Sequence, residues 1–238
     1  MNHIPMPPNV VAEDVGTIFE RRLDATADHL LLVNPDTDSI ARLVETLDGH
    51  DDPPQVSLLA SDRRLKEVME EFLVASRAAD LAERDHLELR SVDDPPNQSL
   101  LVSDGEVTAL VSVENGVGAL GTDAPEFVDA ATDFYTDLFA RAEDYALRTP
   151  ALSRIRRTLE EEIGHETVAD FDAVLTSIER TDAAMTVLDE VTISLLVAAR
   201  NGELLYDISK WGEDVGLASK ATFSRKKTQL EDSGLIDT

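Results

Sequence analysis

Four basic residues near the C-terminal end of the chain stand in a stretch that has no acidic residue. Lys220, Arg225, Lys226 and Lys227 lie within residues 215–230, whereas the whole chain has 48 aspartates and glutamates against 21 lysines and arginines. Ammonium and guanidinium groups on one helix can bind the phosphates of DNA, and an arginine can also form two hydrogen bonds with guanine. This local reversal of charge predicts contact with DNA.

The segment 219–236 predicts a helix whose two sides differ in character. At about 100° per residue, Phe223 and Leu230 fall on one side and Arg225 on the other, among small and polar residues. We expect Arg225 to contact guanine and the lysines to contact phosphates. The predicted DNA-binding residues are Ser219, Lys220, Thr222, Ser224, Arg225, Lys226, Lys227 and Thr228. The alternative is a solvated basic face, but the chain avoids lysine elsewhere.

The elements around this helix follow the order of a winged helix-turn-helix. Residues 188–199 and 206–215 predict two helices, and Gly216 predicts the turn before a third helix, which Ser219 caps. Residues 235–236 predict the start of a wing strand. Because the sequence stops two residues later, we expect a truncated wing.

The first half of the chain predicts an α/β fold with a mixed sheet. Short apolar runs bounded by turn residues predict buried strands, and Asp104-Gly105 predicts a hairpin. The expected strands are 30–33, 56–60, 87–90, 99–103 and 107–113. The expected helices are 11–27, a helix that Asp38 or Ser39 caps and that runs through Leu47, 63–82 and 125–146, with a glycine-rich passage at 115–121 before the last.

Between these two parts, two helical apolar stripes meet at Gly164. They predict helices that pack between the domains, with a role in forming a homodimer as the further hypothesis, because twofold proteins commonly read palindromic DNA. The sequence thus predicts an effector-binding α/β domain (1–146), a helical linker or dimerisation region (147–183) and a winged helix-turn-helix domain (184–238).

Polar residues follow the first two predicted strands, where open α/β sheets commonly bind ligands. Asn34 follows the first strand, and Ser61, Arg63 and Arg64 follow the second. We expect a phosphorylated sugar as a candidate ligand, neutralised by an arginine and bound by backbone N–H groups. The alternative interpretation is an ordinary helix cap with solvated arginines.

The sequence lacks the signatures of common enzymes. It has no cysteine, and none of its five histidines is followed by lysine two positions later, so phospholipase D chemistry is not expected. No phosphate-binding or metalloprotease motif appears, and we predict neither a catalytic residue nor a metal site.

The acidic composition also carries information. A net charge of −27 destabilises a compact chain unless salt screens it, and the Debye length falls to about 3 Å at 1 M salt. We therefore predict a protein of a salt-accumulating archaeon. Without a long apolar run or signal sequence, we expect it in the cytoplasm and not in a membrane.

The stretch LASKATFSRKKTQLEDSGLI, residues 217–236, resembles the recognition-helix region of winged-helix regulators of the MarR, ArsR and TrmB kinds. Over nearly its whole length, the chain resembles the haloarchaeal TbsP-type, or TrmB-suppressor, regulators. The DNA-binding domain comes last here, whereas it comes first in TrmB.

The resemblance implies a transcription factor that binds promoter DNA of genes for sugar metabolism and gluconeogenesis. It also implies a non-catalytic, phospholipase-D-like first domain that is similar to the TrmB effector domain. The alternative hypothesis is an acidic winged helix that binds another protein and does not contact DNA.

Overall fold

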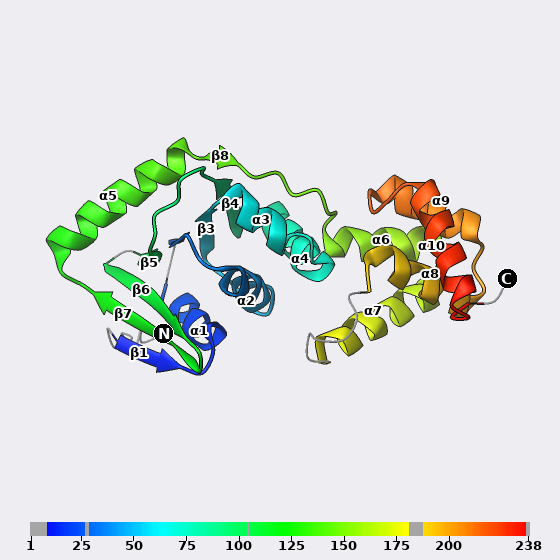
Figure 1. The fold of residues 1–238 in the computed structure, drawn as a ribbon, viewed down its shortest axis with the longest axis horizontal. Coiled ribbons are helices and arrows are strands. Elements are labelled where there is room, and N and C mark those ends of the chain that lie inside the picture. Colours follow the sequence, from blue (N-terminus) through cyan, green and yellow to red (C-terminus); the bar gives the residue numbers. More distant parts are fainter. Residues whose placement is uncertain (1–8, 27–28, 104, 181–187, 237–238) are drawn as a thin grey trace. The chain divides into compact units, whose positions relative to one another are not determined.

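The computed structural model describes residues 9–26, 29–103, 105–180 and 188–236. The chain forms two compact units, Met1–Leu147 and Arg148–Thr238 (Figure 1). The strands are β1 (Asn9–Ala12), β2 (His29–Val33), β3 (Gln55–Ala60), β4 (Leu87–Ser91), β5 (Ser99–Ser103), β6 (Glu106–Val113), β7 (Gly116–Thr122) and β8 (Glu143–Asp144). The helices of the first unit are α1 (Val15–Ala25), α2 (Thr37–Asp48), α3 (Asp62–Val68), α4 (Phe72–Glu83) and α5 (Pro125–Arg141).

The strands of the first unit form one mixed sheet in the order β1-β7-β6-β5-β2-β3-β4-β8. β2, β3 and β4 are parallel, and the other pairings are antiparallel. The three parallel strands are connected by helices, because a parallel pair needs a crossover. The predicted mixed sheet is therefore confirmed.

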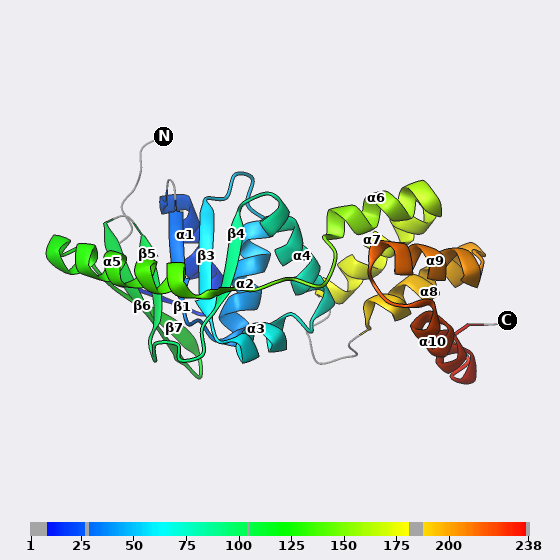
Figure 2. The same ribbon diagram turned by 90° about the horizontal axis from the view of Figure 1, so that it is seen from above.

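Helices cover both faces of this sheet (Figure 2). α1, α2, α3 and α4 pack on one face around Phe19, Leu32 and Leu58, and α5 packs on the other around Leu31 and Val128. The strands β2 and β3 are buried on both faces, which explains their continuous apolar runs.

An arginine inside the first unit connects α1 to the sheet. The guanidinium group of Arg22 is buried and donates to the carboxylate of Glu106 and to the hydroxyl of Thr108 on β6. Such a group is tolerated in a core only when it is paired.

Five features of the first unit differ from the sequence expectations. Residues 9–12 and 116–122 are strands β1 and β7, where the patterns predicted the start of a helix and a glycine-rich passage without a strand. A Cβ at Gly116 would lie 2.9 Å from the carbonyl oxygen of Ala12, so glycine lets these two strands approach.

Asp36, not Asp38 or Ser39, caps α2. The helix expected at 63–82 is broken into α3 and α4 at residues 69–71, and the helix expected at 125–146 ends at Arg141.

The second unit is helical throughout its described residues. Its helices are α6 (Leu152–Glu162), α7 (His165–Arg180), α8 (Glu190–Asn201), α9 (Leu205–Val215) and α10 (Lys220–Asp232). α6 contacts α7 and α9, and α7 contacts α8, so the helices of the predicted 147–183 region belong by their contacts to this unit. The indole Nε1 of Trp211 in α9 donates to Thr158 Oγ1 in α6 at 3.0 Å.

The predicted wing strand is not present in the described residues. After α10, residues 233–236 form turns and bends, and Gly234 has a φ of 71°. Leu235 is instead tied to the helix, because its N–H donates to the carbonyl of Leu230 at 3.0 Å. Leu235, the first residue of the apolar pair that predicted a strand, therefore closes the C-terminal end of α10.

Candidate nucleic-acid interface

α10 begins and is oriented by local signals that the sequence contains. Ser219 caps it, its side chain accepting from the N–H of Thr222 at 3.3 Å, as predicted. The preceding turn uses Gly216 with a φ of 95°, and the N–H of Leu217 donates to the carbonyl of Gly212 at 2.8 Å. A left-handed glycine after a helix is the usual device for such a turn.

Two apolar side chains of α10 pack against the neighbouring helices. Phe223 is fully buried and Leu230 is nearly so, as the helical wheel predicts. The phenyl ring of Phe223 lies against the backbone of α9 at Gly212, where an added Cβ would be 2.2 Å from Cζ and 2.4 Å from Cε2. Glycine at 212 is therefore required for the close approach of α9 and α10.

The opposite side of α10 is open to solvent. Its exposed residues include Ala221, Ser224, Arg225, Thr228 and Gln229. Within the part of the chain that the structure describes, the guanidinium group of Arg225 has neither a hydrogen bond nor an ion pair. A free guanidinium among small side chains can approach a base edge in the major groove, where arginine pairs with guanine.

The three lysines of α10 are each paired with an acid of the same unit. Lys226 binds Asp189, and Lys227 binds Glu231 one turn along the helix. Lys220 lies 3.4 Å from a carboxylate oxygen of Glu213 in α9. Helical spacing predicted that these lysines lie on the flanks of α10, but it did not predict the acids with which they pair. A phosphate contact by Lys226 or Lys227 would have to compete with these ion pairs.

The pair between Lys226 and Asp189 joins the start of α8 to the middle of α10. The carboxylate of Asp189 caps α8, accepting from the N–H and the hydroxyl of Thr192 at 2.8 Å each. Burial alone would raise the pKa of Asp189, but hydrogen bonds from Lys226 and Thr192 outweigh burial, and the pKa lies below its ordinary 3.8. Burial raises the pKa of the neighbouring Glu190.

These shifts predict how the second unit responds to acid. A carboxylate whose pKa folding lowers stabilises the folded state above its unfolded pKa, and this contribution is lost as the pH falls through the folded pKa. Asp189→Asn should keep the helix cap but lose the charge. We expect it to destabilise the unit by about 0.2–1 kcal/mol at neutral pH, since the pair is one-third exposed.

The measurement is the melting temperature of the parent and of Asp189→Asn between neutral pH and the lowered pKa of Asp189. The difference in melting temperature should shrink as the pH falls below about 5. Glu190, whose pKa is raised, has the opposite effect, because its ionisation lowers stability as the pH rises, and it does so in both proteins. Asp214→Asn, an exposed position in α9, is the matched control. A difference that stays constant with pH would contradict the prediction.

Sequence reasoning missed Tyr206 as a candidate contact. It lies in the first turn of α9, is 66% exposed, and the Nζ of Lys220 is 6.0 Å from its ring centroid. Tyrosine hydroxyls are among the groups that bind DNA phosphates. An aromatic residue at the exposed start of the second helix was the available signal.

In the first unit, the structure brings together three of the four predicted ligand residues, because Arg64 contacts both Asn34 and Ser61. Nη1 of Arg64 donates to Asn34 Oδ1 and to the carbonyl of Pro35 at 2.7 Å. Asn34 has a φ of 47°, unusual for a residue other than glycine, and its amide donates to the carbonyl of Pro96. Arg64 therefore holds the turn after β2. Ser61 caps α3, while Arg63 is exposed and has no partner among the described residues.

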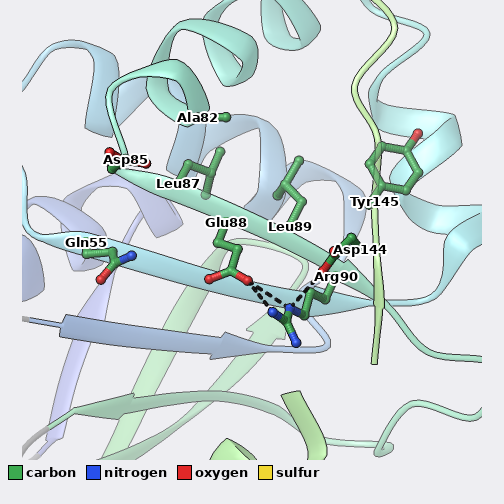
Figure 3. A pocket seen from close by; sticks show the side chains of 9 residues that line it. All are labelled: Gln55, Ala82, Asp85, Leu87, Glu88, Leu89, Arg90, Asp144 and Tyr145. Atoms are coloured by element: carbon green, nitrogen blue, oxygen red, sulfur yellow. Dashed lines mark hydrogen bonds and ion pairs between the residues drawn. The ribbon is translucent and has the colours of Figure 1, made fainter. Parts of the chain in front are cut away.

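A pocket of about 370 Å³ lies at another place in this unit, beside β4 and β8. Arg90 stands in it, paired with Glu88 at 2.7 Å and with Asp144 at 3.3 Å (Figure 3). The guanidinium also stacks over the ring of Phe139 and donates to its carbonyl. None of the predicted ligand residues lines this pocket, and its arginine is already satisfied.

Among the solved structures that are similar to the chain are three with TM-scores of 0.39 to 0.42. The archaeal chromatin protein TrmBL2, whose structure is described as showing a novel mode of DNA binding, is 17% identical over 60% of this chain, with a TM-score of 0.42. The chain spans 55% of the length of that protein.

The other two structures each cover 58% of this chain and 98% of their own. They are the phospholipase D family member Nuc from Salmonella typhimurium (12% identical, TM-score 0.41) and NucT from Helicobacter pylori (10%, 0.39).

No curated protein shows a significant match. None of the described helices is long and apolar enough to cross a membrane.

Two protein families match the sequence in succession and divide it close to the boundary between its compact units. Residues 7–150 match the TbsP-like transcriptional regulator N-terminal domain, and residues 151–238 match the TbsP-like C-terminal helix-turn-helix domain. The chain thus belongs to the TbsP-like transcriptional regulators, as the resemblance over nearly its whole length predicted.

Proposed function

We propose that this regulator binds promoter DNA as a homodimer, with the exposed side of α10 in the major groove. The observation that carries the proposal is Arg225, which is exposed and has no partner among the described residues, on the helix that two buried side chains hold in place. Ser224 and Thr228 beside it are small enough to let the helix approach the bases.

The charge balance around α10 limits how the protein binds DNA. Glu213, Glu231 and Asp189 already neutralise its lysines, so few cations remain for phosphates. Release of counterions also contributes little when the bulk salt is concentrated. Binding therefore depends on direct contacts and on shape.

The test is chromatin immunoprecipitation of the full chain in its source organism, followed by binding of the enriched promoters in vitro at high salt. We expect a limited set of promoters that share a palindromic site. Enrichment of promoters of sugar metabolism and gluconeogenesis would support the proposed targets. If the immunoprecipitation instead recovers other regulatory proteins and no specific DNA, the result would favour the alternative hypothesis that the winged helix binds another protein.

A phosphorylated sugar is the proposed effector, at the edge of the sheet where β2 and β3 end. The support is the strained turn at Asn34, the cap at Ser61 and the unpaired cation of Arg63. Arg64 would act by holding the turn. Sugar phosphates at 100-fold excess over their dissociation constant should raise the melting temperature of the full chain by about 5 °C or more.

Differential scanning fluorimetry with phosphorylated and unphosphorylated sugars measures this shift. Arg63→Ala should reduce it without lowering stability, and Arg21→Ala, an exposed arginine on α1, is the matched control. If no sugar phosphate shifts the melting of the parent or changes its DNA affinity, the effector proposal fails.

We further propose that the first unit is not an enzyme. Histidine and lysine in an H-x-K arrangement carry phospholipase D chemistry, and no histidine of this sequence has a lysine two positions later. Phosphodiester hydrolysis by the purified chain would overturn this proposal.

A further inference from the structure

One end of the sheet has an apolar face that the described helices of the first unit leave exposed. Its large side chains are Val11 on β1, Val111 and Val113 on β6, and Leu120 on β7, which are 84%, 46%, 67% and 52% exposed. We call these four residues the valine face. Large exposed apolar groups that share a surface commonly mark an interaction site.

The strand register places the valine face on one side of the sheet. Val11 pairs with Gly118, which also pairs with Val111, and directly paired residues point the same way. Leu120 and Val113 lie two residues further along their strands, so they share this side. The opposite side carries Val10 and Ala119, which are buried in the core under α1.

α5 lies on the same side of the sheet as the valine face (Figure 2). It contacts β5 and β6, and Val107 and Ala109 pack in its cluster. Further along β6, Val111 and Val113 have no such cover. α5 itself exposes Phe127 and Phe134.

This surface is uncharged in a chain of which 29% of the residues are charged. The residues of β1, β6 and β7 that point to this side beyond Val107 are Asn9, Val11, Ala109, Val111, Val113, Gly116, Gly118, Leu120 and Thr122. Exposed acids follow the strands at Glu13, Glu114 and Asp123. An apolar centre with a charged rim is the usual anatomy of a protein interface.

We infer that the valine face binds the same face of a second copy of this chain. Two chains of charge −27 repel each other, and a face without charge is where they can meet without opposing like charges. A basic partner would be expected to meet acids across the contact, whereas here the acids stand only at the rim.

The second unit offers less apolar surface for a dimer. Among its described side chains, the large exposed apolar residues are Leu204, Tyr206 and Leu235, and none lies on α6 or α7. We therefore place the dimer contact on the first unit. This proposal depends on the proposed function, in which a dimer binds a twofold DNA site. The experiment below measures the mass of the species and not DNA binding, so the two proposals can fail separately.

The experiment is analytical ultracentrifugation of the full chain in dilute buffer and in molar salt. We expect a species of twice the 26.0 kDa chain mass that becomes more stable as salt screens the rim. Val111→Glu and Val11→Glu should each weaken the dimer about 100-fold or more, because a carboxylate would be desolvated against its own copy. Val11 is mostly exposed, so its variant should fold even if Val111→Glu does not.

Leu235→Glu, an equally exposed apolar position in the second unit, is the matched control and should remain dimeric. Circular dichroism checks that each variant is folded. A parent that is monomeric in both buffers overturns the inference, whether or not it binds DNA. So does a dimer that persists in both valine-face variants, or one that salt dissociates.

Discussion

Arg225→Ala should weaken binding to the recovered promoter sites about 10- to 100-fold, the loss expected for one bidentate contact between arginine and guanine. Arg225 has no partner among the described residues, so its removal should leave the stability of the unit unchanged. The effect should fall on specific sites and less on random DNA, because a base contact carries sequence information and a phosphate contact does not. Fluorescence anisotropy with both DNAs at high salt measures the two affinities.

Two variants separate specific recognition from charge. Arg225→Lys keeps the positive charge but cannot form the paired hydrogen bonds in the same geometry, so it should resemble the alanine variant on specific DNA. Arg154→Ala, an exposed arginine on α6, removes the same charge elsewhere in the unit and should bind like the parent. Equal affinities of Arg225→Ala and the parent would show that α10 does not read bases through this residue.

Gly212→Ala should destabilise the second unit by about 1–3 kcal/mol, the usual cost of overpacking a well-packed core. The added methyl group would lie 2.2 Å from Cζ of Phe223, and this ring is fully buried, so it has no free space to move into. α10 would be pushed away from α9, and we also expect weaker DNA binding. Thermal and chemical unfolding of the full chain measure the loss of stability.

A double-mutant cycle tests whether this contact is the cause. Phe223→Leu removes the ring, so the Gly212→Ala change should cost clearly less in that background, with a coupling within the range of about 0.5–3 kcal/mol seen for residues in contact. Lys210→Ala, at an exposed position of α9, is the control for a change in the same helix. Additive effects of the two substitutions would mean that the helix is destabilised for another reason.

The two predictions concern opposite sides of one helix. Phe223 and Leu230 fix α10 on its neighbours, and the same period of the helix directs Arg225 outward. The lysines between these sides are paired with Asp189, Glu213 and Glu231. The pairs with Asp189 and Glu213 join α10 to the start of α8 and to α9, whereas the pair between Lys227 and Glu231 lies within α10.

Features that depend only on neighbouring residues could be predicted from the sequence alone. The apolar runs of β2 and β3, the hairpin between β5 and β6, and the cap of α10 at Ser219 are where the patterns predicted them. Burial of Phe223 and Leu230 also followed from helical spacing alone. Helix period, capping and turn glycines act over a few residues, so their signals are complete within a short window.

The tertiary structure decided the features that join distant segments. It made a strand of the glycine-rich passage at 116–122, because β1 and β6 supply hydrogen-bonding partners on its two sides. It paired Lys226 with Asp189, and Arg64 with the turn after β2. It also set the ring of Phe223 against Gly212 and, among the described residues, left the valine face exposed. Spacing along the chain carries no information about such contacts, because they depend on which surfaces meet after the elements pack.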